Sequence, residues 1–255
     1  MTSRTRTHAL VATGAAALLL ATLSGCGTGA DDAPVEKKAF AYDGKALTID
    51  SGNSTLDVVP ADVEQIEVTR RVDGWVVLGS GPDAVWKLEG DKLTLGVECS
   101  AMISNCDAHH QVKVPRGTAL TVDSDNGTVT ASGFGTPLSL SSDNGDVVVR
   151  DASGSLELST DNGTVLAERV SAASVVARSS NGEVELGFSG VPDLVDTVTD
   201  NGSITIGLPR SGGAYAVSAS TDNGGVDIGV PRSETSGHVV KARSGNGEVT
   251  VRTAN

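Results

Sequence analysis

Four residues near the middle of the chain have side chains that form disulfides or bind metal ions. Cys99 and Cys106 are separated by six residues, and His109 and His110 follow shortly after them. In an exported protein, an even pair of cysteines favours an intrachain disulfide. The two cysteines and two histidines would also be competent zinc ligands, but their spacing is irregular. We therefore predict a Cys99–Cys106 disulfide and no metal or other cofactor, and keep the zinc site as the alternative.

A third cysteine follows an apolar leader at the start of the chain. Two arginines and a histidine precede an apolar run over residues 9–23, which is too short for a comfortable membrane span. The end of the run, Leu23-Ser24-Gly25-Cys26, resembles the lipobox of bacterial lipoproteins. That resemblance implies a signal peptide over 1–25, a lipid such as palmitate on Cys26, and an extracytoplasmic protein anchored to the cell membrane. An ordinary secretory leader and an uncleaved anchor are the alternatives.

Carboxylates recur at one position of a repeated motif, directly before an asparagine. They are Asp125, Asp143, Asp161, Asp200 and Asp222. If the copies stack as coils, these side chains form a column with neighbours about 4.8 Å apart, and such a column offers oxygen ligands to hard cations. The other interpretation is that Asp and Asn bond locally to the turn backbone, or form an amide ladder, and face water. We favour the second, because the chain lacks the nonapeptide pattern of calcium-binding rolls.

The segment 229–239 holds the remaining candidates for acid–base chemistry. It contains Glu234 and His238 beside Arg232. An envelope polysaccharide-processing enzyme on a β-helix scaffold would need an acid and a base in different environments. The carboxylates elsewhere repeat evenly, and the sequence has neither a Gly-x-Ser-x-Gly elbow nor a phosphate-binding loop. We predict that the protein is not an enzyme and has no catalytic residue, with the polysaccharide enzyme as the alternative.

All of these residues are positioned by an internal repeat, an Asn-Gly pair between two alternating apolar runs. The pairs begin at Asn126, Asn144, Asn162, Asn181, Asn201, Asn223 and Asn246, with spacings of 18 to 23 residues. Apolar residues stand six and usually four positions before each Asn, and three and five positions after it; Ser or Thr stands two before. Residues two apart share one face of a strand, so each copy predicts two short strands joined by a sharp turn.

The copies are compatible with a stack of parallel coils or with a meander of hairpins, for which Asn-Gly is a strong signal. The connection between copies lengthens along the chain while the strand-turn-strand unit stays constant, as stacked coils tolerate. Burying five side chains per copy contributes about 10 kcal/mol, whereas ordering 18 residues costs roughly 20 to 30 kcal/mol. A copy therefore folds only against neighbours. We predict an all-β protein, a parallel β-solenoid of about seven to eight coils.

The region before the clear repeats divides into a tether and a cap. Residues 26–38 are rich in Gly, Ala, Asp and Lys, which suits a flexible tether. Residues 39–119 predict an irregular strand-rich cap, with a degenerate first repeat around Asn53, and 120–255 contain the regular repeats. The cap strands are expected at 63–72, 75–78, 85–88, 93–97 and 111–114. Trp75 and Trp86 are expected to pack inside the cap.

The start of the regular repeats also carries a family resemblance. Val112-Lys113-Val114-Pro115-Arg116-Gly117, followed by successive Ser/Thr-x-x-Gly-x-Val/Ile phrases, resembles the bacterial "putative adhesin" domain of unknown function. The resemblance covers about residues 47–251. It implies a β-solenoid at the cell surface, and because its motifs are structural it transfers a fold rather than a function.

Charge limits the range of partners. The chain has a net charge of −13, which becomes −15 when Arg4 and Arg6 are removed with the leader. A field of this sign repels phosphate backbones, and seven aromatic residues offer little surface for stacking bases, so nucleic acid is excluded as a partner. We predict a lipid-anchored, non-catalytic interaction or structural module, adhesin-like, with the membrane and an unidentified envelope protein or glycan as partners.

Overall fold

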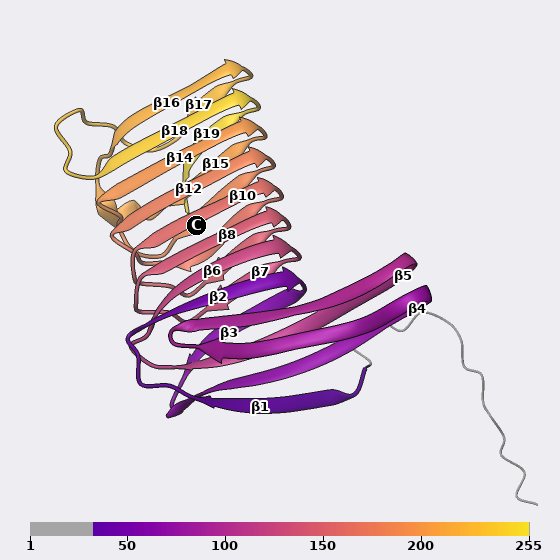
Figure 1. Cartoon of the computed structure of the whole chain (residues 1–255). Helices are drawn as coiled ribbons and strands as arrows, with labels where there is room; N and C mark the ends of the chain where they lie inside the picture. Colours follow the sequence, from indigo (N-terminus) through magenta and orange to yellow (C-terminus); the bar gives the residue numbers. More distant parts are fainter. Residues whose placement is uncertain (1–32, 255) are drawn as a thin grey trace, which may run out of the picture.

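The computed structural model describes residues 33–254 and contains nineteen β-strands (Figure 1). The leader and Cys26 lie outside the described residues. Within 33–254 there is no α-helix, only a 3-10 turn at Arg210–Gly212, and no helix that could span a membrane.

Sixteen strands form eight coils of two strands each. In chain order the coils are β2 (Ala46–Asn53) with β3 (Thr55–Ala61), β6 (Ala119–Asn126) with β7 (Val129–Ser132), β8 (Leu138–Asn144) with β9 (Val147–Arg150), β10 (Leu156–Asn162) with β11 (Val165–Val170), β12 (Ser174–Asn181) with β13 (Val184–Phe188), β14 (Leu194–Asn201) with β15 (Ile204–Leu208), β16 (Ala216–Asn223) with β17 (Val226–Ile228), and β18 (Val239–Asn246) with β19 (Val249–Thr253).

The coils stack in parallel, and equivalent residues lie side by side. Asn162, for example, pairs in register with Asn144 on one side and Asn181 on the other. Each first strand alternates buried and outward residues, and each second strand turns its apolar residues toward the same interior, as Leu158 and Val165 do. The parallel β-solenoid prediction is confirmed, because parallel ladders exclude the hairpin meander.

The last two coils stack in the reverse of their sequence order. β14 pairs with β18, and β18 then pairs with β16, so the C-terminal coil lies inside the rod. The connection 209–215 skips one coil position, and the long connection 229–238 returns the chain to it. The coil β16–β17 consequently forms the open end, where the inward residue Val226 is 44% exposed.

The opposite end is covered by β1 (Val35–Ala41), β4 (Gln65–Glu89) and β5 (Lys92–Pro115) (Figure 1). β4 and β5 form one antiparallel ribbon. β5 pairs with β2 near its beginning and with β3 near its end, so both ends of the ribbon stay on the first coil. The middle of the ribbon, residues 72–84 and 97–107, extends outward and folds back; we call it the arm.

Three expectations for this region need correction. The five short cap strands are parts of only two long ones, because the ribbon pairs continuously through the segments that looked like breaks. The tether does not reach Lys38, since β1 begins at Val35 and pairs with β4. Trp86 packs against the core as expected, but Trp75 is 53% exposed on the arm.

Candidate functional site

The asparagines of the repeat form one continuous amide ladder along an edge of the rod. The ladder runs in the order Asn53, Asn126, Asn144, Asn162, Asn181, Asn201, Asn246 and Asn223, and from Asn126 onward each Nδ2 donates to the Oδ1 of the preceding Asn over 2.7–3.2 Å. The degenerate first repeat therefore takes part through Asn53. The side chains of these asparagines bond to one another, so the ladder holds the stack together rather than offering a binding site.

A second ladder explains the Ser or Thr two positions before each Asn. In six of the seven regular copies the hydroxyl donates to the carbonyl of a glycine in the adjacent coil; Thr160 Oγ1 donates to Gly145 O over 2.8 Å and Ser179 Oγ to Gly163 O over 3.1 Å. Ser124 is the exception, since its buried hydroxyl has no partner among the described residues. A hydroxyl satisfies its hydrogen bond inside the turn where an apolar side chain would leave that carbonyl with one partner fewer. The sequence analysis found that Ser or Thr recurs at this position, but it did not predict the hydrogen bond to the adjacent coil.

The five aspartates that precede the asparagines are exposed at this edge. Asparagine amides also approach the backbone carbonyls of aspartates in the adjacent coil, as Asn162 Nδ2 does to Asp143 O at 3.3 Å. Asp222 forms an ion pair with Arg243 at 3.6 Å. Within residues 33–254, no group of three or more His, Cys, Asp or Glu side chains is arranged to hold a metal ion.

The cysteines and histidines singled out in the sequence lie in different surroundings. Cys99 and Cys106 are joined by a disulfide in the arm. His109 Nε2 lies 2.8 Å from Asp57 Oδ2, whereas His110 is fully buried and neither of its ring nitrogens has a hydrogen-bond partner among the described residues. Burial, together with the charges of Arg70 and His109, lowers the pKa of His110 to about 4, so the ring is neutral at pH 7.

Glu234 and His238 lie in the long connection near the open end. His238 Nδ1 lies 3.0 Å from the carbonyl of Pro192 and 3.5 Å from Asp193 Oδ1. Glu234 is exposed, and no contact in the described part of the chain joins it to His238. The structure therefore does not bring these two candidates together as an acid–base pair.

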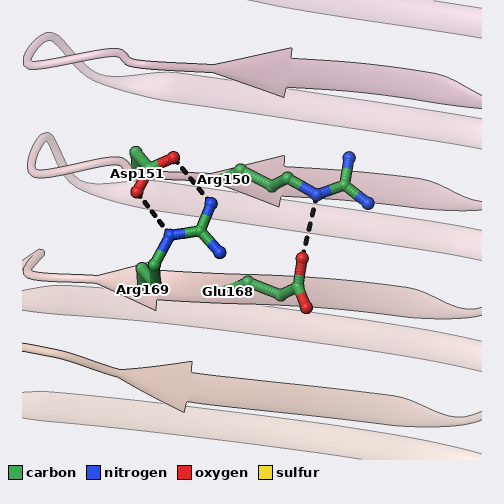
Figure 2. Close-up of polar contacts among 4 residues, drawn as sticks. All are labelled: Arg150, Asp151, Glu168 and Arg169. Carbon is green, nitrogen blue, oxygen red and sulfur yellow. Dashed lines mark hydrogen bonds and ion pairs between the residues drawn. The ribbon is translucent and has the colours of Figure 1, made fainter.

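A charged cluster that sequence reasoning missed lies where β9 and β11 end (Figure 2). Arg150 Nε donates to Glu168 Oε2 over 2.8 Å, and Arg169 bonds both carboxylate oxygens of Asp151 at 2.7 Å. The hydrogen bonds from Arg169 lower the pKa of Asp151, and the same bonds raise the pKa of Arg169. Asp151 and Arg169 have positive φ angles of 54° and 53°, so the double contact accompanies a strained corner.

A groove of about 570 Å³ adjoins this cluster on the outer wall. Its floor is formed by Gly187 and Gly207, which are register partners on β13 and β15. Charged and polar side chains surround the floor, namely Glu168, Arg169, Glu185, Thr205, Arg252 and Thr253. A Cβ at Gly187 would lie 3.6 Å from Ala167 O, and one at Gly207 would lie 3.7 Å from Ala254 Cβ. Both are ordinary contacts, so the backbone would accept side chains where the groove has none.

The stacked coils, the amide ladder and the uncovered outer walls define a β-solenoid whose recurring residues are structural. The chain belongs to the Toastrack DUF4097 family, whose model matches residues 44–255. This assignment confirms the family resemblance carried by the segment before β6 and by the repeats.

Comparisons with solved structures and with curated proteins gave two further results. A solved structure of a "putative cell adhesion protein" from Clostridium sporogenes is similar to this chain, with a TM-score of 0.41 and 11% identity over 87% of this chain and 99% of the other. No curated protein matches the chain in sequence.

Proposed function

We propose that the protein is a non-catalytic interaction module of the cell envelope, tethered to the membrane by a lipid on Cys26. The groove over β13 and β15 carries the proposal. It has acidic and basic side chains around a glycine floor, although the chain as a whole is strongly acidic. Such an open, mixed-charge surface suits an extended polar partner, a glycan strand or a segment of an envelope protein.

The charged groups near the groove support binding rather than acid–base catalysis. Asp151 is held by Arg169, whose hydrogen bonds lower the pKa of its carboxyl, and Glu168 is bonded to Arg150. A general acid needs the opposite, a raised pKa close to the working pH. The alternative of a polysaccharide-processing enzyme would depend on Glu234 and His238, which are not in contact.

Filling the groove tests the proposed binding surface. The double variant Gly187→Gln, Gly207→Gln adds two side chains to the floor without a backbone clash. Cosedimentation with purified envelope fragments should then fall at least fivefold, with an unchanged melting temperature. The matched control is Gly225→Gln, whose Cβ would have no neighbour within 4 Å and which lies in a turn that does not line the groove. Undiminished binding by the filled variant would exclude the groove as the site.

The tether is tested separately. The leader and the lipobox-like sequence before Cys26 support cleavage and acylation at this residue. The wild-type chain should fractionate with membranes and have an intact mass that includes acyl chains on Cys26, whereas Cys26→Ser should lose the acyl mass. A mature amino terminus upstream of Cys26 would contradict the tether.

A further inference from the structure

The arm has a compact interior that is closed by the disulfide. Residues two apart on β5 face inward, so Val97 and Ala108 are buried between the outgoing and returning halves, and Cys99 and Cys106 come next along each half. A Cβ at Gly74 would lie 3.0 Å from Cys106 Sγ, so the backbone of β4 packs directly on the disulfide. The arm is therefore a covalently closed projection rather than a loose loop.

The outside of the arm is unusually apolar for an exposed surface. Trp75 and Val77 are two apart on β4, and Ile103 lies opposite Val77, so all three belong to one face. Their exposed fractions are 53%, 45% and 59%, and Leu78 at the bend is 86% exposed. The arm holds four of the eight large apolar side chains that are exposed in the described residues, and Val85, directly after its first half, is a fifth. A concentrated apolar patch of this kind indicates an interaction surface.

The arm lies at the end of the rod where the chain enters from the proposed anchor. Val35, the first residue of β1, is opposite Arg71 at the root of the arm. The seven residues from Arg71 to Leu78 extend about 23 Å at the rise of a strand. The nine residues from Cys26 to Val35 can reach at most about 30 Å. A lipid on Cys26 would thus hold the root of the arm within about 30 Å of the membrane surface, close enough for an arm of about 23 Å to bring its tip to the bilayer.

We propose that the arm is a second membrane contact, in which Trp75, Leu78 and Ile103 enter the interfacial region of the lipid bilayer. Trp is suited to this region because its ring is apolar with one polar N–H. The inference rests on the lipid tether of the proposed function, which turns weak insertion into an effectively intramolecular step.

The acidic residues of the arm determine which kind of lipid headgroup it should favour. Asp73, Asp83, Glu98 and Asp107 belong to the arm, and residues 72–86 and 93–108 contain no Lys or Arg. Like charges repel at the surface of an anionic membrane. The arm should therefore insert into zwitterionic bilayers more strongly than into anionic ones, with the difference shrinking at high salt.

The chain has only two tryptophans, which makes the test direct. Trp86 is half-buried under Arg70, whose guanidinium lies 3.7 Å from its ring, so Trp86→Phe leaves Trp75 as the sole reporter. All nineteen strands lie between Val35 and Thr253, so a chain that begins at Gly27 keeps the whole described fold. An N-terminal hexahistidine tag binds it to phosphatidylcholine vesicles that contain nickel-chelating lipid. Because the tag supplies the anchor, the result does not depend on acylation of Cys26.

Insertion should shift Trp75 emission to shorter wavelength, and brominated phosphatidylcholine should quench it at least twofold. Leu78→Asp should remove most of this quenching, whereas Val226→Asp at the open end of the rod should leave it unchanged. Replacing part of the lipid with phosphatidylglycerol should weaken it at low salt. Equal emission with brominated and ordinary lipid, for a protein shown to be vesicle-bound, would overturn membrane insertion while leaving the tether and the groove intact.

Discussion

The close approach of coils at the Asn-Gly turn makes Gly163→Ala an informative perturbation. Gly163 lies in the middle of the rod, and its φ is outside the left-handed range, so alanine brings no backbone strain. A Cβ there would lie 2.2 Å from Gly145 O, 2.6 Å from Gly145 C and 3.2 Å from Asp146 N. Relief of the clash with the carbonyl oxygen requires the two turns to separate by about 1 Å.

That separation breaks contacts on both sides of the turn. It lengthens the bond from Gly145 N to Asn162 O, now 3.0 Å, and the ladder bond from Asn162 Nδ2 to Asn144 Oδ1, now 3.1 Å. Two weakened hydrogen bonds at about 1 kcal/mol each, with lost packing below them, give a destabilisation of about 3 kcal/mol. For a domain of this size the melting temperature should fall by roughly 10 °C.

Thermal unfolding followed by circular dichroism at 218 nm measures the effect. Gly225→Ala is the matched control, because its Cβ would have no neighbour within 4 Å although it also lies in an Asn-Gly-type turn. Its melting temperature should stay within about 2 °C of the wild type. If Gly163→Ala melts together with this control, the turns are not packed on one another and the reasoning fails.

Three further outcomes follow from the buried histidine, the disulfide and the carboxylates. Because the pKa of His110 is lowered in the fold, the folded state favours the neutral ring. The free energy of unfolding is therefore unaffected by titration of this residue above pH 6.5 and falls by up to about 3 kcal/mol as the pH drops toward 4. Urea titrations across that range measure the loss, and His110→Leu should remove this part of the pH dependence. Reduction of Cys99–Cys106 should expose the arm to limited proteolysis while the coils keep their melting temperature. A reduced protein whose coils also melt at a lower temperature would contradict an independent arm. Adding millimolar calcium, or removing it with a chelator, should leave the melting temperature unchanged, and an upward shift with calcium would show that the turn aspartates bind cations.

The sequence predicted the coils because one local phrase repeats, and the period of two within each copy determines which side chains face inward. It did not predict that the C-terminal coil lies between β14 and β16, because any copy of the phrase can pair with any other. The folded-back arm depends on contacts of β5 with β2 and β3 that are distant in the sequence. The groove was also hidden, since Gly187 and Gly207 form a floor only once their strands are adjacent in register.

Cross-linking of the last coils tests the stacking most directly. Thr205 on β15 is the register partner of Thr250 on β19, whereas Asp227 on β17 lies one coil further away. Adjacent parallel strands bring Cα atoms within the range of a disulfide, and a gap of two coils does not. The pair Thr205→Cys, Thr250→Cys should therefore oxidise to a disulfide, and Thr205→Cys, Asp227→Cys should not. The reverse result would mean that the coils stack in sequence order and would contradict the described rod.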